Sequence, residues 1–322
     1  MRMKRAIKRF WYYLQTYDKP RVIVVCGPTA SGKTSLALSI AKELKLSGRK
    51  CEIVSADSRQ IYEEIPNFSG AIARKDQQNV PHHFVGTETL ETPRNVWWFR
   101  ETSLALIKDI RDRSACPLVV GGTGFWIQAL LFKDMFPEVP VDASLRKSLS
   151  SLNNEELEHR IRKLDPEYLE RNKETTTRRL IRAIEIATAL GKVPERTRTC
   201  DTRYRYVVVY LDLEPQQLHR NITKGVSERL YKGMQQELVD VFERYGKART
   251  TEIGLGFKAY RQYVTSGSHA SLMELISTHE KQYAKRQKTF FRKMLDEFPG
   301  PSYRATSSSD ALAYLQSCGY LR

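Results

Sequence analysis

The sequence has no hydrophobic run long enough to cross a membrane. Its longest apolar runs, such as residues 22–26, have the length of a strand, whereas a spanning helix needs roughly 18 apolar residues. The basic first seventeen residues also lack the apolar segment and small-residue cleavage site of a secretory signal. These absences exclude a membrane-spanning protein, and we expect no membrane partner.

The sequence has few cysteines, and their spacing does not suggest pairs. The five cysteines are odd in number, far apart and without a Cys-x-x-Cys pair, so neither a disulfide framework nor a structural zinc site is expected. His82 and His83 are adjacent but have no matching ligands, so we interpret them as structural residues rather than metal ligands. We expect a monomer in a reducing, cytoplasmic compartment.

The composition is that of a folded, basic protein. Of 322 residues, 41% are hydrophobic and 28% charged, which is ordinary globular usage and excludes a disordered or fibrous chain. The 53 Lys and Arg against 37 Asp and Glu give a net charge of +16. This excess favours a polyanionic partner, with nucleic acid first, although a generally basic and soluble surface is the alternative.

Short β-branched runs predict a parallel sheet. Runs at 21–26, 51–56 and 117–120 end in Gly or Asp, and helix-patterned stretches separate them, as in βαβ units. A fourth run at 206–213 follows some 85 residues later, which is too far for one crossover, so something is inserted. The intervening charged helices, from about Asp142 to Leu190, are typical of a clamp for a large substrate.

We therefore predict an α/β protein with an inserted helical domain. The expected parts are a basic N-terminal arm at 1–20, an α/β core at 21–135, a substrate-clamping helical insertion at 136–205, a return to the core at 206–298, and a loosely attached tail at 299–322. The N-terminal segment is expected to be an extra basic arm or helix packed on the core, with a transit peptide as the alternative.

A phosphate-binding loop follows the first predicted strand. The pattern G-x-x-x-x-G-K-[ST] lets backbone N–H groups point at phosphate oxygens and places a helix N-terminus behind them. It makes the core P-loop NTPase-like, with Lys33 as a mobile charge and the Thr34 hydroxyl as a ligand for Mg²⁺. The diphosphate- or nucleotide-binding residues are Gly27, Pro28, Thr29, Ala30, Ser31, Gly32, Lys33 and Thr34.

The second predicted strand brings a carboxylate to the same edge of the sheet. Asp57 could hold Mg²⁺ through water or accept a proton from an attacking nucleophile, and Gln60 offers a donor and an acceptor for an adenine edge. The glycines of 121–124 would let backbone approach a ligand closely, or simply form a strand-to-helix turn. Nucleotide hydrolysis, phosphoryl transfer and displacement of pyrophosphate from carbon all remain open at this point.

Several motifs together resemble the tRNA dimethylallyltransferases, the isopentenyl transferases of transfer RNA. The passages that carry the likeness are GPTASGKT at 27–34, DSRQIY at 57–62, PHHF at 81–84, VVGGTGFWIQALL at 119–131, RRLIRAIE at 178–185, RLYKGMQQEL at 229–238, GLGFKAY at 254–260 and AKRQKTFFRK at 284–293. A P-loop is common to many families, but its conjunction with DSRQIY and GGTGFW is specific.

The resemblance implies a reaction and roles for particular residues. The P-loop would grip the diphosphate of dimethylallyl diphosphate rather than ATP, and the acceptor would be N6 of the adenosine just 3′ of the anticodon, position 37. Asp57 would take the N6 proton, and Thr123 and Arg146 would steady the transition state. Residues implied to bind tRNA are Asp57, Ser58, Arg59, Gln60, Arg178, Arg179, Arg182 and Lys258.

The stretch from Lys281 to Lys293 adds six basic residues and no acid, interleaved with Tyr283, Phe290 and Phe291. Such a stripe can pair phosphates and stack bases, with Lys285 and Arg286 as RNA contacts, or it can pack aromatics inward and solvate the cations.

Two departures from the family pattern accompany the likeness. Residues 67–76 are only loosely similar to the family's stretch, and Thr175 and Thr176 stand where asparagines are common. The alternatives are an enzyme that prenylates free AMP, ADP or ATP, a P-loop small-molecule kinase, and an RNA-binding protein without activity.

Overall fold

The structure is a computed structural model that describes residues 2–133, 137–173, 175–195, 197–253, 255–266 and 272–321. The chain forms two compact units. The first, the core unit, consists of Met1–Leu131 and Cys200–Arg322, and the second, the helical unit, is Phe132–Thr199.

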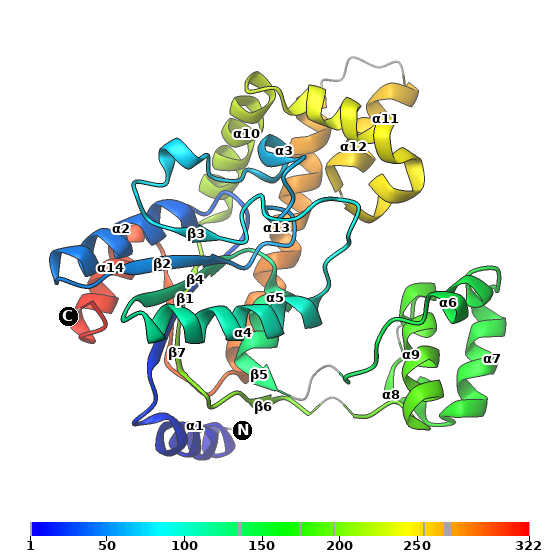
Figure 1. Ribbon diagram of the computed structural model, residues 1–322, viewed down its shortest axis with the longest axis horizontal. Helices are drawn as coiled ribbons and strands as arrows, with labels where there is room; N and C mark the ends of the chain where they lie inside the picture. The colour runs from blue at the N-terminus through cyan, green and yellow to red at the C-terminus, as the bar shows by residue number, and fades with distance from the viewer. Residues whose placement is uncertain are drawn as a thin grey trace. The chain divides into compact units, whose positions relative to one another are not determined.

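The core unit is built on a six-stranded parallel sheet (Figure 1), with the strand order β3-β2-β4-β1-β7-β8. The pairings place Cys26 beside Gly121 and Ser55 beside Val120, so β1, β4 and β2 end at one edge of the sheet. The predicted parallel sheet is confirmed. The strands are β1 (Arg21–Cys26), β2 (Cys51–Ser55), β3 (His82–His83), β4 (Cys116–Gly121), β7 (Arg205–Leu211) and β8 (Ser302–Ala305).

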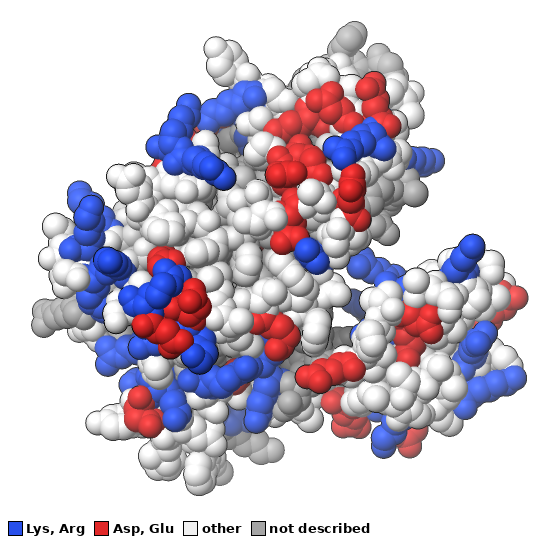
Figure 2. Space-filling model, viewed as in Figure 1, with Lys and Arg blue, Asp and Glu red and all other residues white. Residues whose placement is uncertain are grey.

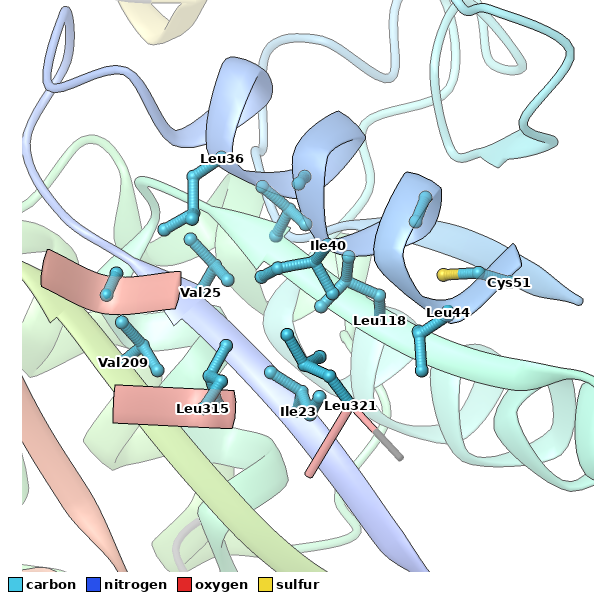
Figure 3. Packing of buried hydrophobic residues seen from close by; sticks show 14 of the residues in the cluster. Ile23, Val25, Leu36, Ile40, Leu44, Cys51, Leu118, Val209, Leu315 and Leu321 are labelled. Carbon is cyan, nitrogen blue, oxygen red and sulfur yellow. The ribbon is translucent and has the colours of Figure 1, made fainter. Parts of the chain in front are cut away.

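A large buried cluster lies between the sheet and two helices, α2 (Lys33–Leu46) and α14 (Ser308–Ser317). Figure 3 shows Leu36, Ile40 and Leu44 of α2 pointing at the strand residues Val25 and Leu118. Leu36 and Ile40 are 0% exposed, and burying each such side chain contributes about 1.5–3 kcal/mol. The apolar spacing along α2 thus fixes the helix that follows the P-loop against the sheet.

The C-terminal segment is part of this core, so the prediction of a loosely attached tail after residue 299 is wrong. β8 pairs with β7 in parallel register from Ser302 beside Val208 to Ala305 beside Leu211. Leu315 and Leu321 are buried in the cluster of Figure 3. The physical reason is that β7 would otherwise be an open sheet edge, and α14 covers apolar surface that α2 leaves exposed.

The N-terminal segment forms α1 (Arg2–Thr16). Tyr12 is 4% exposed, its hydroxyl oxygen accepts the Tyr206 N–H at 3.0 Å, and its ring meets Phe298 edge-on at 5.5 Å. Thr16, one turn later, is also buried. The arm is therefore a helix that packs on the core unit through a narrow row of side chains.

The other elements of the core unit are mostly helical. A short bend at Gly233 separates α10 from α11, and Gly246, with φ 68°, kinks α11. These elements are α3 (Pro66–Ser69), the 3₁₀ turn η1 (Arg74–Asp76), α4 (Val96–Asp112), α5 (Gly124–Leu131), α10 (Pro215–Tyr231), α11 (Met234–Ile253), α12 (Leu255–Ser266) and α13 (Leu272–Glu297). Within the described part of the chain, no helix is both long and apolar enough to cross a membrane.

The helical unit has a small apolar core of its own. Its helices are α6 (Ala143–Leu149), α7 (Asn154–Leu164), α8 (Tyr168–Arg171) and α9 (Thr177–Leu190), and a two-stranded sheet joins β5 (Phe132–Lys133) to β6 (Thr199–Cys200). Asn153 and Glu156 form a capping box at the start of α7. The unit covers 132–199, whereas the sequence placed the insertion at 136–205. The buried residues that unite its helices are Leu149, Leu157, Ile161, Tyr168, Leu180, Ala183, Ile184 and Ala187.

Candidate active site

The phosphate-binding loop connects β1 to α2 at the carboxyl edge of the sheet. Ala30 and Gly32 have left-handed backbone conformations, with φ 57° and 88°, which turn successive N–H groups toward a common centre. A β-carbon on Gly27 would lie 2.8 Å from Ser31 Oγ and 3.0 Å from the Leu211 carbonyl oxygen, so any side chain there would be crowded. The loop therefore has the conformation that a phosphate cradle requires, at the N-terminus of a 14-residue helix.

Lys33 supplies the loop's charged side chain. Its Nζ donates to the Pro28 carbonyl oxygen at 2.6 Å, which holds the ammonium group over the loop. Burial lowers the pKa of Lys33 to about 8, and the negative charge of Asp57 partly opposes this shift. The two side chains thus interact electrostatically across the gap between the P-loop and β2.

Asp57 follows β2 and points its carboxylate into the same region. Its Oδ1 accepts the Arg59 N–H at 3.0 Å, which fixes the carboxylate in a tight turn. Its Oδ2 lies 3.6 Å from the point where a β-carbon on Gly122 would stand. Asp57 is therefore placed between the P-loop lysine and the glycine turn after β4.

Thr123 ties the glycine turn to the segment after β2. Its Oγ1 accepts the Ser58 N–H at 2.9 Å and donates to Ser58 Oγ at 3.2 Å, while its own N–H donates to the Ala56 carbonyl oxygen. A β-carbon on Gly121 would come within 2.1 Å of that same carbonyl oxygen. The glycines of 121–124 thus serve close backbone contact between loops, and Thr123 joins Asp57 and Ser58 in one site.

Gln287 of α13 links the two loops, and no role for it was predicted from the sequence. Its Oε1 accepts the Thr29 N–H at 2.9 Å, and its Nε2 donates to the Gly122 carbonyl oxygen at 2.7 Å. The side chain is 6% exposed, so both bonds lie in a protected environment. The signal in the sequence that could have identified Gln287 is its position in the AKRQKTFFRK motif. A single glutamine among cations, however, indicates no particular contact.

Arg59 and Gln60 are held by contacts within the core unit. The Arg59 guanidinium donates to the Ile253 carbonyl oxygen and lies 6.0 Å from the centre of the Phe68 ring. The Gln60 side chain accepts from Ser55 Oγ at 3.2 Å. Tyr283 of α13 faces this group, and burial, aided by the Asp57 charge, raises its pKa.

The basic stretch 281–293 divides between internal and exposed roles. Lys288 and Arg292 pair with Asp212 at 3.0 and 3.1 Å, and Phe291 is 0% exposed, so stacking of bases on Phe291 is excluded. Lys285 and Arg286 are exposed on α13, as Lys258 is on α12. For Phe291, the alternative that the aromatic side chains of this stretch pack inward is therefore confirmed.

Four other expected site residues lie in the helical unit. Arg146 makes two hydrogen bonds with the Glu185 carboxylate, both at 2.8 Å, and Arg182 bonds to Glu185 at 3.2 Å and to the Val139 carbonyl oxygen at 2.7 Å. Burial acts to raise the pKa of Glu185, but its arginine bonds outweigh this and the pKa is lowered. Arg178 and Arg179 are exposed in the first turn of α9.

Figure 2 shows one face of the molecule with both signs of charge. Acidic side chains gather on it over α11, and basic and acidic side chains alternate over α4. This face is therefore not a uniformly basic surface, although the net charge of the chain is +16.

No metal-ligating group of three or more His, Cys, Asp and Glu occurs among the described residues. His83 instead pairs with Glu52 at 2.7 Å, and His82 Nδ1 lies 2.8 Å from the Val80 carbonyl oxygen. The hard oxygen atoms of the exposed Thr34 hydroxyl and the Asp57 carboxylate suit Mg²⁺ that is held mainly by a diphosphate and water. The side chains present thus fit that ion better than zinc.

Comparisons with known proteins agree with this architecture. The sequence model of the family described as IPP transferase matches residues 60–294. The tRNA dimethylallyltransferase of Acetivibrio thermocellus is 32% identical over 283 residues, 85% of this chain and 89% of the relative. That of Chlorobium limicola is 34% identical over 294 residues, with 87% and 90% covered.

Two solved structures are also similar. The tRNA delta(2)-isopentenylpyrophosphate transferase of Staphylococcus epidermidis has a TM-score of 0.65 at 25% identity, over 94% of this chain and 99% of that one. A eukaryotic dimethylallyltransferase that acts on tRNA has a TM-score of 0.78 at 24% identity, over 94% and 77%, and shows the likeness of fold.

A parallel sheet with a phosphate-binding loop after its first strand defines a P-loop NTPase-like protein. Within that class the chain belongs to the IPP transferase family, because the family match covers most of its length and relatives above 30% identity align over most of theirs. The expected fold class, family and transferase class are thereby confirmed.

Proposed function

We propose that this protein transfers a dimethylallyl group from dimethylallyl diphosphate to N6 of adenosine 37 of tRNA and releases pyrophosphate. In this reaction the C1–O bond of the donor breaks, the C1–N6 bond forms, and the N6 proton leaves to a base. The names of the relatives and the family match support the donor and acceptor classes.

The observation that carries the proposal is the placement of Asp57 between Lys33 and the glycine turn after β4. A carboxylate beside a diphosphate cradle is positioned to remove a proton from an amine that attacks the carbon attached to that diphosphate. The Arg59 N–H, which donates to Oδ1 of Asp57, holds this carboxylate. Ser58 and Thr123, which bond to each other, tie the segment after β2 to the glycine turn. The base would be Asp57.

The P-loop residues 27–34 are proposed to bind the diphosphate through backbone N–H groups and the Lys33 ammonium. Mg²⁺ held by Thr34 and the diphosphate would neutralise charge on the leaving group. Arg146 is proposed to stabilise the negative charge on the leaving diphosphate. For this its guanidinium would replace one of its hydrogen bonds to Glu185 with a bond to the diphosphate.

We propose that the exposed cations contact the anticodon arm of the tRNA and that the target nucleotide binds near Asp57. Extrusion of a base from an anticodon loop costs only a few kcal/mol, which favours a loop adenosine. Residues proposed for these contacts are Ser58, Arg59, Gln60, Arg178, Arg179, Arg182, Lys258, Lys285 and Arg286. We further propose that the protein acts as a monomer in the cytoplasm.

The direct test uses purified protein with dimethylallyl diphosphate, Mg²⁺ and unmodified tRNA. We expect release of pyrophosphate and prenylated adenosine, detected by mass spectrometry of the nucleosides. Asp57→Asn keeps the hydrogen-bonding shape but removes the base, so kcat should fall about 10²–10⁴-fold while tRNA binding persists. A variant with the turnover of the unchanged protein would eliminate Asp57 as the base.

A further inference from the structure

The outward face of α1 is apolar, although the helix packs on the core unit by its other side. Tyr12 and Thr16 are buried, whereas Ile7, Phe10 and Leu14 are 50%, 59% and 50% exposed. At 3.6 residues per turn these three share one side of the helix, roughly opposite Tyr12. Figure 1 draws α1 at the lower edge of the core unit, and Figure 2 shows mostly uncharged side chains there.

This face is a concentration of exposed apolar side chains. Of the thirteen large hydrophobic residues that are exposed in the described part of the chain, six lie between positions 7 and 17. Trp11 is 57% exposed, Tyr13 45% and Tyr17 67%, and they border the row formed by Ile7, Phe10 and Leu14. A continuous apolar surface of this kind marks a binding face rather than scattered surface residues.

The charges around this face are of one sign. Lys8 and Arg9 are exposed and lie on the two borders between the buried row and the apolar face. The sequence places Arg2, Lys4 and Arg5 in the same helix, and the first acidic residue is Asp18. Arg205 adds a cation 5.2 Å from the centre of the Tyr13 ring.

We propose that α1 binds the surface of an anionic lipid bilayer, with its apolar face in the interface and its cations at the headgroups. An amphipathic helix with Trp, Phe and Leu on one face and Lys and Arg beside it lies in the plane of such a surface. Anionic lipid complements the uniform positive charge, and Trp and Tyr favour the headgroup level. This mode of binding needs no spanning helix.

The arrangement of the side chains favours lipid over RNA as the occupant. Single-stranded RNA binds to aromatic rings interleaved with cations, which pair with phosphates next to each stacked base. On α1 the cations stand outside the apolar row, and two members of that row, Ile7 and Leu14, are aliphatic. These two side chains match acyl chains and offer no ring to a base, and Phe10 is the single aromatic member of the row, so the row itself has no successive rings on which neighbouring bases could stack.

The test is flotation of the full chain with vesicles of phosphatidylcholine alone and with vesicles that also contain phosphatidylglycerol. We expect binding to the anionic vesicles that weakens as salt rises, and a blue shift of Trp11 fluorescence that Trp11→Phe removes. The double variant Phe10→Ser/Leu14→Ser should bind roughly tenfold more weakly or worse. Lys8→Gln/Arg9→Gln should lose most of the preference for phosphatidylglycerol.

Tyr231→Ser is the matched control, because Tyr231 is 94% exposed on α10 of the same unit. It should bind vesicles as the unchanged protein does, and all variants should melt at the same temperature since the altered side chains are exposed. Absence of vesicle binding, or equal binding by Phe10→Ser/Leu14→Ser, overturns the proposal. If vesicles are not bound, two other results would identify a different occupant of this face. Dissociation of a dimer by the double variant would indicate a second copy of the chain, and loss of RNA binding in the double variant would indicate RNA.

Discussion

At the scale of single residues, Lys33 links proton binding to ligand binding. Its pKa of about 8 results from burial, so the free protein loses this positive charge as pH rises above 8. A diphosphate stabilises the charged form and raises the pKa, so binding above pH 8 takes up a proton. We predict that affinity for pyrophosphate falls by up to tenfold per unit as pH rises from about 8 to about 9.5.

Calorimetric titration in two buffers of different ionisation enthalpy measures both the affinity and the proton uptake. Lys33→Arg is the control, because a guanidinium stays charged over this pH range and should remove the part of the slope that Lys33 causes. An identical pH dependence in the two proteins would show that Lys33 is not the titrating group.

Gln287 is the second residue whose position decides the site. Gln287→Ala leaves the Thr29 N–H and the Gly122 carbonyl oxygen without their partner in a buried place, which costs about 1–3 kcal/mol. We predict a lower melting temperature and a higher KM for dimethylallyl diphosphate, because the P-loop is no longer tied to the glycine turn. Gln282→Ala, exposed on the same helix, should change neither quantity.

At the scale of elements, the C-terminal strand and helix are part of the folding unit. Leu315 of α14 is 0% exposed and packs in the cluster with Val209 and Ala305. We predict that Leu315→Ala destabilises the core unit by about 2–5 kcal/mol through lost burial and a cavity. Thermal or denaturant unfolding measures this, and Gln316→Ala on the exposed side of the helix should cost far less. A neutral Leu315→Ala would restore the idea of a loosely attached tail.

At the scale of the whole molecule, the net charge of +16 distinguishes the possible acceptors. A protein that neutralises several tRNA phosphates releases counterions, and its affinity falls steeply with salt. We predict that the dissociation constant for unmodified tRNA rises about a hundredfold or more as monovalent salt increases from about 50 to about 200 mM. An adenosine nucleotide should show a much smaller slope, and a flat tRNA titration with strong AMP prenylation would favour the free-nucleotide alternative.

The sequence predicted the parts of the fold that depend on local pattern. The β-branched runs located β1, β2, β4 and β7 within one or two residues, because buried parallel strands are almost continuously apolar. β3 and β8 are short and partly polar, so no pattern marked them, and their pairing is a property of the assembled sheet. The same holds for the packing of α14.

The site divides in the same way. By itself the sequence determined the P-loop, the family and the carboxylate after β2, because glycine spacing and motif order are local properties of the chain. Only the tertiary structure decided that Gln287 joins two loops, that Phe291 is buried, and that α1 turns an apolar face outward. Those features depend on contacts between side chains that are far apart in the sequence, and no local sequence pattern specifies such contacts.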